Sequence, residues 1–147
     1  ALDDVVWMRD LRSGKYLFIS RAVEQVYGVS AQAFERDGQY WINCVFGEDK
    51  ALVQSKQATL KKQGWAEIEY RVVRPDGSLR WLRDRTRVLA GGDGDPAWLI
   101  GIATDISTQR RHTEHIHRLS NYDTLTGLPN RAMLDSLLHA ALESARR

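Results

Sequence analysis

The most restrictive feature of this sequence is the change of pattern near residue 65, where hydrophobic and polar residues begin to alternate. Residues 66, 68, 70 and 72 are Ala, Ile, Tyr and Val, whereas the intervening residues 67, 69 and 71 are all charged. A period of two predicts a β-strand with one buried face. Turn sequences at 74–77 and 91–96 separate this strand from two more strand segments. The last of them, 97–103, is almost wholly apolar, which is typical of a central strand.

The first half of the chain predicts a hairpin followed by short helices. Strand-forming residues at 5–11 and 16–20 flank a Ser-Gly turn. Helical spacing then covers 21–27, 31–36 and 50–63. The apolar stripe of the longest helix is expected to consist of Leu52, Val53, Lys56 and Leu60. The element order β-β-α-α-α-β-β-β predicts an α+β fold.

Composition bounds the class of protein. The 147 residues are 43% hydrophobic and 27% charged, which is typical of one globular domain with an appendage. No apolar run approaches the roughly 20 residues of a membrane span, and no signal peptide is recognisable at the start. Cys44 is the single cysteine, which excludes an internal disulfide and a multi-cysteine zinc site. We therefore expect this part of the protein to be cytoplasmic and to make no membrane contact itself. A membrane anchor upstream of Ala1 is left as an open alternative.

Charge divides the chain into two parts. Residues 1–108 carry fifteen Lys and Arg against fifteen Asp and Glu, whereas residues 109–147 carry six against four, together with all four histidines. The net charge of +2 therefore belongs to the tail. A polar helix is expected to run to about Asn121, with Asp105 or Ser107 as its N-cap. The expected segments are a domain at 1–108, a linker helix at 109–121 and a further segment at 122–147.

Several short motifs occur together in the predicted domain. They are Glu69-Tyr70-Arg71, Asp76-Gly77-Ser78, Trp81 and the run GIATDIS at 101–107. Upstream, Trp41 and Glu48-Asp49 add a partial motif, in which Phe46-Gly47 stands where His-Pro is usual. Together these residues resemble the PAS family of sensory domains over 1–108. The resemblance implies an α+β PAS fold, in which a five-stranded antiparallel sheet carries helices on one face and a C-terminal linker helix follows.

A second motif lies in the tail. Residues 123–131 read DTLTGLPNR and resemble the opening of GGDEF diguanylate cyclase domains. The resemblance implies that 122–147 is the truncated start of such a domain, and that the full-length bacterial protein makes or binds cyclic di-GMP, often with a phosphodiesterase domain beyond. The metal-binding acids and the nucleotide-binding loop of that family come later. We therefore expect no catalytic residue, no metal site and no enzyme activity in this chain, and we interpret Gly91-Gly92-Asp93 as a turn.

The resemblance also implies a place for a ligand, because PAS domains often enclose a small molecule between sheet and helices. The expected lining consists of inward-facing strand residues and a tryptophan near the helices. These candidate pocket residues are Trp41, Tyr70, Leu82 and Thr86. The five tryptophans are dispersed along the chain and are interpreted as packing residues rather than as an aromatic cage. The ligand stays unknown, and a ligand-free structural PAS dimer module is the alternative.

Haem and flavin are both disfavoured, so no cofactor is predicted. Residues 1–111 contain no histidine, which leaves only Cys44 or Met8 as a haem ligand. Asn43-Cys44-Val45-Phe46 resembles the cysteine motif of light-sensing LOV domains, but Val45 replaces an arginine. Residues 64–106 also contain no Asn or Gln to contact a flavin ring. We interpret Cys44 as a structural cysteine, with a LOV-like flavin photosensor as the less favoured alternative.

A row of arginines raises the question of nucleic-acid binding. Arg83, Arg85 and Arg87 share one face of their predicted strand. Pairing across the preceding turn places Glu67 and Glu69 opposite two of them, which balances the charge. We therefore expect no nucleic-acid partner.

The linker is the expected route for a signal. Asp105 and Ser107 would fix the start of the helix, and Asp123 would begin the effector domain. A seam of Gln109, His112, Ile116 and Leu119 has coiled-coil spacing but is half polar. We expect a homodimer that forms through the PAS domain and this helix. Each chain would carry its GGDEF domain in cis, after the linker helix. A signal would shift the contacts of the seam and thereby change how the two GGDEF domains are placed. A solvent-exposed connector is the alternative for the helix.

Overall fold

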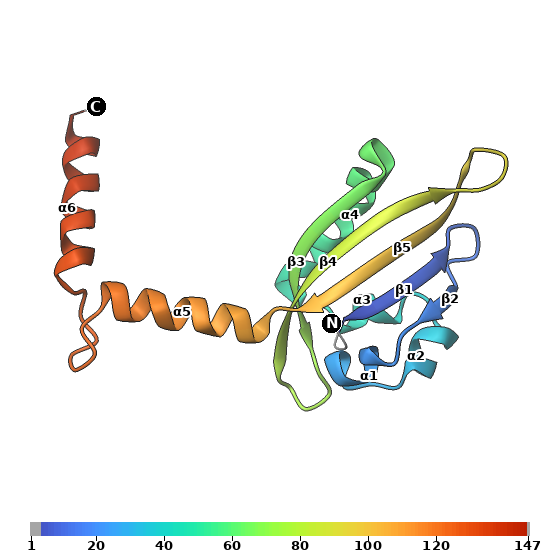
Figure 1. Cartoon of the computed structure of the whole chain (residues 1–147), viewed down its shortest axis with the longest axis horizontal. Helices are drawn as coiled ribbons and strands as arrows, with labels where there is room; N and C mark the ends of the chain where they lie inside the picture. Colours follow the sequence, from blue (N-terminus) through green and yellow to red (C-terminus); the bar gives the residue numbers. More distant parts are fainter. Residues whose placement is uncertain (1–3, 147) are drawn as a thin grey trace. The chain divides into compact units, whose positions relative to one another are not determined.

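The chain forms a five-stranded antiparallel sheet with helices packed against it, and the computed structural model describes residues 4–146 (Figure 1). The strands are β1 (Val5–Asp10), β2 (Tyr16–Ile19), β3 (Trp65–Val73), β4 (Leu79–Ala90) and β5 (Pro96–Asp105). The helices are α1 (Ala22–Tyr27), α2 (Ala31–Arg36), α3 (Tyr40–Cys44), the 3₁₀ turn η1 (Gly47–Asp49), α4 (Lys50–Gln63), α5 (Ser107–Asn121) and α6 (Arg131–Ala145). The predicted α+β class is confirmed, with α3 and η1 as additions.

The sheet has the strand order β2-β1-β5-β4-β3. The chain forms the β1-β2 hairpin, crosses to the far edge through the helices, and returns strand by strand from β3 to β5 (Figure 1). The last strand, β5, thereby lies between β1 and β4, as its apolar sequence predicts. Gly101 is required in this central strand, because an added Cβ would fall on the ring of Trp7 in β1.

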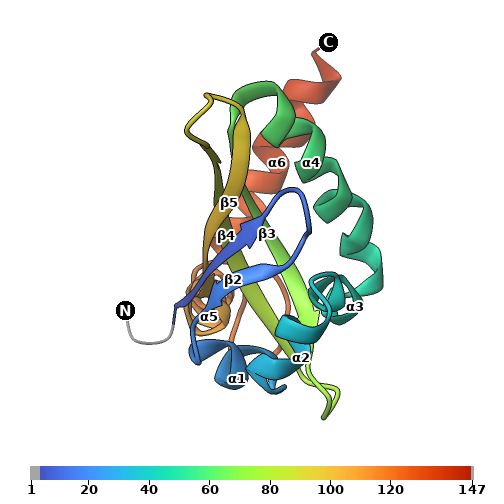
Figure 2. The same ribbon diagram turned by 90° about the vertical axis from the view of Figure 1, so that its right-hand side faces the viewer.

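Helices α1 to α4 cover one face of the sheet, and the core lies between the two layers (Figure 2). The largest fully buried side chains of this core are Tyr70, Phe34, Leu82, Val5, Val23 and Val72. On the strands these residues alternate with exposed or half-buried ones, as a period of two predicts. Ile100 and Ile102 of β5 point to the opposite face, where they are exposed.

Helix α4 follows directly from its sequence. Gly64 ends it in a left-handed conformation (φ +79°), and the N–H of Gly64 donates to the carbonyl of Leu60. Val53, Lys56 and Leu60 are buried along one stripe. Leu52, which we expected in the same stripe, is 45% exposed. Consecutive residues of a helix are rotated by about 100° around its axis, so the side chain of Leu52 points away from the sheet that Val53 faces.

The sequence does not predict the short helix α3. This helix has no side-chain N-cap. Aromatic packing holds it instead, since the Tyr40 ring lies 5.4 Å from the Phe34 ring in a T-shaped arrangement. The ring of Trp41 lies 6.3 Å from that of Tyr70 in the sheet. Tertiary contacts rather than local propensity therefore account for this helix.

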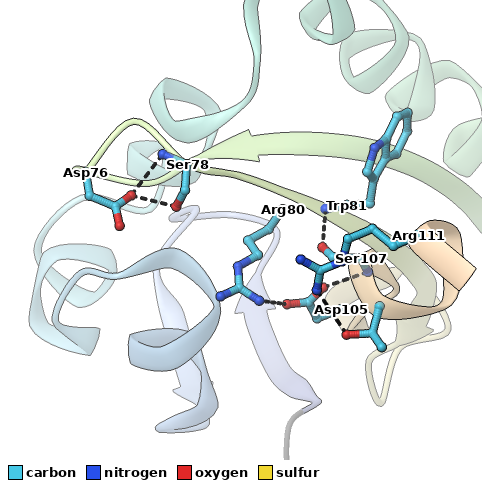
Figure 3. Close-up of polar contacts among 8 residues, drawn as sticks. Asp76, Ser78, Arg80, Trp81, Asp105, Ser107 and Arg111 are labelled. Carbon is cyan, nitrogen blue, oxygen red and sulfur yellow. Dashed lines mark hydrogen bonds and ion pairs between the residues drawn. The ribbon is translucent and has the colours of Figure 1, made fainter.

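The β3–β4 turn is fixed by its own side chains (Figure 3). The Asp76 carboxylate accepts hydrogen bonds from the N–H and the hydroxyl of Ser78 at 2.9 and 2.6 Å. These bonds hold the pKa of Asp76 below its ordinary value. Gly77 supplies the positive φ that the turn requires, +85°. The resulting register pairs Tyr70 with Leu82 across the two strands.

The chain divides into two compact units, Ala1–Ser107 and Thr108–Arg147. In the second unit, Asp123 organises the loop after α5, because its Oδ1 accepts hydrogen bonds from the N–H groups of Leu125 and Thr126 at 2.9 and 3.0 Å. Asn130 caps α6 by accepting from the N–H of Met133. Within residues 4–146 no helix combines the length and the apolar character needed to cross a membrane.

Candidate functional site

A small cavity lies between the helices and the sheet of the first unit. Its volume is about 20 Å³, which is enough for one water-sized group. Four strands, α1 and α3 contribute the residues of its lining whose side chains carry polar atoms: Trp7, Arg9, Tyr16, Tyr27, Trp41, Tyr70 and Asp84. The rest of the lining is mostly aliphatic and aromatic. The cavity therefore combines a few polar groups with an apolar wall.

Asp84 is the anionic group of this site. It points from β4 into the core and is 3% exposed. Its Oδ2 accepts hydrogen bonds from the ammonium of Lys56 at 3.1 Å and from the hydroxyl of Tyr70 at 3.2 Å. Its Oδ1 accepts one from the hydroxyl of Thr86 at 2.9 Å. Because Lys56 is also buried, the two desolvated charges depend on each other for compensation.

Two tryptophan rings flank the Lys56 ammonium. Its Nζ lies 5.6 Å from the ring centre of Trp7 and 6.0 Å from that of Trp41. These distances are within the range of cation–π attraction. Both rings also pack against the hydrophobic core, so their interpretation as packing residues holds for this pair. The sequence did not show that the fold brings both rings to one cation.

The indole N–H of Trp41 is the only buried side-chain polar group in residues 4–146 that lacks a hydrogen-bond partner. The tyrosines of the site stay protonated, because burial raises the pKa of Tyr16, Tyr27 and Tyr70 above the ordinary value. Neighbouring Tyr27 and Asp84 add to this effect at Tyr70. The tyrosine hydroxyls consequently remain hydrogen-bond donors, and Asp84 is the carboxylate of the lining.

The four predicted pocket residues divide into two pairs. Trp41 and Tyr70 line the cavity. Leu82 and Thr86 are buried in β4 but lie outside its lining. Thr86 contributes indirectly, through its hydrogen bond to Asp84.

Sequence reasoning missed the pairing of Lys56 with Asp84, although a signal for it was present. Lys56 falls within the apolar stripe of the helix at 50–63. Asp84 lies between Leu82 and Thr86 on the inward face of its strand. A lysine and an aspartate on two faces that are both expected to be buried predict each other as partners.

Cys44 ends α3 and is half buried. Its Sγ lies 3.8 Å from the carbonyl oxygen of Tyr40, and burial raises the pKa of the thiol. The described part of the chain contains no group of three or more His, Cys, Asp or Glu arranged to hold a metal ion. A cavity of about 20 Å³ is also far smaller than a flavin ring system or a porphyrin.

Hydrogen bonds attach the start of α5 to β4 (Figure 3). The Ser107 hydroxyl oxygen accepts from the backbone N–H of Trp81 at 2.8 Å, and the N–H of Ser107 donates to Oδ1 of Asp105 at 2.9 Å. Asp105 also pairs with Arg80 at 3.2 Å. The N–H of Ile106 donates to the carbonyl of Trp81 at 2.8 Å. The fold thus brings Asp105 and Ser107, two of the predicted transmission residues, to one junction on β4.

Arg71 connects this junction to the start of α4. Its N–H and Nε donate to Oδ2 of Asp49 at 2.8 and 2.9 Å, and its Nη2 donates to Oδ1 at 2.8 Å. These bonds from Arg71 hold the pKa of Asp49 below its ordinary value. The guanidinium also lies 4.3 Å from the ring centre of Phe46 and 5.1 Å from that of Trp81. One side chain therefore contacts the helix start, the sheet and the residue that holds Ser107.

The remaining predicted transmission residues lie in the second unit. Ile116 and Leu119 are 63% and 52% exposed on α5. Asp123 lies in the following loop, where hydrogen bonds from the N–H groups of Thr126 and Leu125 hold its pKa below the ordinary value. The two aliphatic side chains leave α5 with an exposed apolar pair.

The arginine row of β4 is paired as expected. Glu67 is the direct cross-strand neighbour of Arg85, and Glu69 that of Arg83. The shortest N–O distances are 3.5 Å in the first pair and 3.1 Å in the second. These cross-strand ion pairs confirm the predicted charge balance, and their partial exposure means that each adds little stability.

Sequence comparison finds relatives that match more than half of this chain. A protein of Sinorhizobium fredii described as uncharacterized protein y4lL is 35% identical over 107 residues, which cover 66% of this chain and 13% of that protein. Cyclic di-GMP phosphodiesterase PdeR of Escherichia coli is 33% identical over 79 residues, covering 54% of this chain and 12% of that protein. The matched part of this chain thus spans about an eighth of the length of either relative.

Solved structures share the fold of the first unit. The N-terminal domain of a diguanylate cyclase with a PAS/PAC sensor from Marinobacter aquaeolei has a TM-score of 0.67 at 23% identity, covering 73% of this chain and 98% of that one. The PAS domain of a protein from Colwellia psychrerythraea has a TM-score of 0.60 at 22% identity, covering 72% and 88%. The sequence profile described as PAS fold matches residues 16–103, which is more than half of the chain. This chain belongs to the PAS family.

Proposed function

We propose that the first unit is a sensory PAS input domain that alters the start of α5 according to the state of the Lys56–Asp84 site. Through α5 it would regulate a GGDEF domain that follows in cis. The observation that carries this proposal is a continuous series of contacts from the cavity to Ser107. Support for the cyclic di-GMP context comes from the motif at 123–131 and from the relatives, one a cyclic di-GMP phosphodiesterase and one the N-terminal domain of a diguanylate cyclase.

The first step of the proposed route runs along α4. Asp49 and Lys56 are seven residues apart, which is about two helical turns, so both lie toward the sheet. Lys56 bonds to Asp84 beside the cavity, and Asp49 accepts the hydrogen bonds of Arg71. A shift of α4 that changes the first contact would therefore change the second.

The second step crosses from β3 to β4 and on to α5. Arg71 stacks on the ring of Trp81, and the backbone N–H of Trp81 donates to the hydroxyl oxygen of Ser107. Ser107 is the first residue of α5. A displacement of Arg71 would thus reach the output helix through two contacts.

Self-association is the second part of the proposal, because two GGDEF domains must meet to join two GTP molecules. Ile116 and Leu119 on α5 can contribute about 1.5–3 kcal/mol each on burial, which does not offset an association cost of about 4–15 kcal/mol. The outer face of the sheet supplies further apolar area, with a shallow groove lined in part by Trp65, Ile100 and Ile102. We propose a homodimer that uses both surfaces. The chain by itself is proposed to have no cyclase activity.

A fusion protein tests the route. In it, the DTLTGLPNR motif of this chain continues into an active GGDEF domain, and cyclic di-GMP production is measured. Ser107→Ala removes the acceptor for Trp81 and should change the rate severalfold. Ser55→Ala is the matched control, because among residues 4–146 that exposed hydroxyl bonds only to the carbonyl of Leu52 in its own helix, at 2.6 Å. Equal rates for the unmodified fusion and both variants would contradict a role for the junction.

A ligand-free structural dimer module is the second candidate function. The observation that favours it is the internal saturation of Asp84 by Lys56, Tyr70 and Thr86 beside a cavity of only about 20 Å³. Under this function the cyclase rate of the fusion depends on the dimer fraction alone. Ser107→Ala would then leave the rate unchanged at protein concentrations that saturate the dimer.

A further inference from the structure

We propose that the cavity beside Lys56 binds a small carboxylate or similar oxyanion, which accepts hydrogen bonds from the indole N–H of Trp41 and from the ammonium of Lys56. This inference rests on the proposed sensory function and names the class of ligand for it. Three properties of the site carry the argument. It contains unused hydrogen-bond donors, its net charge is positive, and it is small.

Trp41 and Lys56 supply the unused N–H donors on which the proposal rests. The Trp41 indole N–H is buried and has no partner in the part of the chain described. Lys56 has three N–H groups, and its one hydrogen bond to a described residue goes to Asp84. The other neighbours of its ammonium are the faces of Trp7 and Trp41, which attract a cation but are weak acceptors. A ligand that completes this site must therefore supply acceptor oxygens.

The acceptor of the site is largely occupied. Asp84 already receives hydrogen bonds from Lys56, Tyr70 and Thr86, and a carboxylate has only about four acceptor positions. An amine ligand would have to replace Lys56. Replacement of the Lys56 ammonium by a ligand ammonium would only put one buried cation in the place of another. The indole N–H of Trp41 would still have no hydrogen-bond acceptor. The hydrogen-bonding pattern thus favours an anion over an amine.

The charges of the site point in the same direction. Arg9 and Asp84 are the charged residues of the lining, and Lys56 reaches Asp84 from α4. Arg9 donates from Nε and Nη2 to the carbonyl oxygen of Gly14 at 3.2 and 3.1 Å, and it forms no ion pair with a described carboxylate. Two cations therefore accompany one carboxylate. An added anion balances the site, whereas an added cation increases an imbalance that is costly in a desolvated interior.

Size limits the ligand to a few atoms. The volume of about 20 Å³ holds roughly one water-sized group. A carboxylate of one or two carbons exceeds it, so its entry requires neighbouring side chains to move. The proposal assigns this movement to the Lys56 ammonium, which lies outside the lining at 3.1 Å from the lining residue Asp84. The aliphatic wall of Val5, Val23 and Ala103 accepts a methyl group. Anions of formate and acetate size are therefore expected, and their binding would move Lys56 on α4, the step that the proposed route requires.

NMR spectroscopy of the 147-residue chain tests this ligand class. Each tryptophan gives one indole N–H signal, and comparison with Trp41→Phe identifies the signal of Trp41. Titration with sodium acetate should shift this signal downfield and saturably, with a dissociation constant of about 0.1–10 mM for so small a ligand. Sodium chloride at equal ionic strength and ethylammonium chloride should not. No saturable shift with acetate, an equal shift with chloride, or a response to ethylammonium alone would overturn the proposal.

Variants then identify the groups that hold the anion, with backbone amide signals near the cavity as the readout. Trp41→Phe keeps an aromatic ring but removes the donor, and should weaken acetate binding about 3- to 10-fold. Trp98→Phe is the matched control, because Trp98 lies in β5 outside the lining and should bind acetate like the unmodified chain. Lys56→Met should abolish binding. Since that variant also uncovers Asp84 and can unfold the chain, Lys56→Arg, which keeps a cation, is measured beside it and should still bind. Binding that survives unchanged in Trp41→Phe would overturn the assignment.

Failure of this inference can be told apart from failure of the proposed function. The acetate titration reports on the cavity, whereas the cyclase fusion reports on Ser107. A chain that ignores acetate while Ser107→Ala still changes the cyclase rate would reject the ligand class and support the route. A chain that binds acetate while Ser107→Ala has no effect would do the reverse.

Discussion

The ammonium of Lys56 lies 3.1 Å from the carboxylate of Asp84, so that one ion pair joins helix α4 to the sheet through the core. Both side chains are almost fully buried, at 6% and 4% exposure. Removal of one partner leaves an uncompensated charge, whereas replacement of both by apolar residues does not. The pair therefore constrains the position of α4 more than it adds to net stability.

Lys56→Met should lower the free energy of unfolding by about 3–5 kcal/mol, because Asp84 is left buried without its counter-charge. The double variant Lys56→Met, Asp84→Leu should regain much of this loss. Urea unfolding followed by circular dichroism at one pH measures both. Lys62→Met, an exposed position in the same helix, should stay within about 0.5 kcal/mol of the unmodified chain. A double variant no more stable than Lys56→Met would show that the two residues are not a unit.

Arg71→Lys should destabilise the first unit by about 1–3 kcal/mol, although it keeps the positive charge. Lysine cannot reproduce the two-pronged bond to Asp49, nor can it stack between the rings of Phe46 and Trp81. Urea unfolding is again the measurement. Arg87→Lys serves as control because Arg87 is exposed on β4. Equal effects of the two substitutions would mean that the contacts of Arg71 contribute no more than a surface arginine does.

The bonds from Arg71 also predict how stability depends on pH. They lower the pKa of Asp49 in the folded chain. A carboxyl with a lowered folded-state pKa contributes stability above its unfolded-state pKa, and this contribution is lost as the pH falls below about 4 toward the folded-state pKa. The stability difference between the unmodified chain and Asp49→Asn should therefore be constant near neutrality and shrink below about pH 4. Urea unfolding across this range measures it, and a difference that grows on acidification would contradict the assignment.

Gly101→Ala should destabilise the sheet by about 1–3 kcal/mol, because the new methyl group would overlap the Trp7 ring on the neighbouring strand. Gly92→Ala is the control, since a Cβ at that position meets no other atom within 4 Å. Thermal unfolding of both variants compares them directly. Equal melting temperatures would mean that β1 and β5 can separate locally at no cost.

Ile116→Asp should weaken self-association without abolishing it, and truncation after Ser107 should act similarly, because the outer sheet face is proposed to carry part of the contact. Sedimentation velocity over a concentration series measures the dimer fraction of each. His117→Asp places the same charge on α5 away from the seam, since no seam residue lies three or four positions from His117, and it should have a smaller effect. An intact chain that stays monomeric throughout the series would remove the dimer from the proposal.

Much of the fold could be predicted because its signals are local. The helix expected at 50–63 is observed at Lys50–Gln63, since its glycine stop and its apolar spacing act within a few residues. The pairing of Glu69 with Arg83 followed from the turn and the period of two alone. Helix α3 could not be predicted in the same way, because its order comes from rings such as that of Phe34, which belong to another helix.

The candidate site was predicted less completely for a related reason. A pattern of hydrophobic spacing shows which side chains face inward, and so it indicated Tyr70, Leu82 and Thr86, whereas Trp41 was expected near the helices from the resemblance to PAS domains. It does not show which inward side chains meet. Trp7, Trp41 and Lys56 come from β1, α3 and α4, and only the packing of these elements brings them to one point. The roles of Asp105, Ser107 and the α5 seam in transmission stay predictions.

The position of β5 has a consequence for how the protein is made. This strand is the last of the five to leave the ribosome, yet it fills the middle of the sheet between β1 and β4. The β1–β2 and β3–β4 hairpins therefore emerge without the neighbour that joins them, and the sheet closes only after Asp105 has been synthesised. The same closure brings Ser107 to Trp81. A nascent chain thus gains an ordered start of α5 in the step that completes its PAS domain.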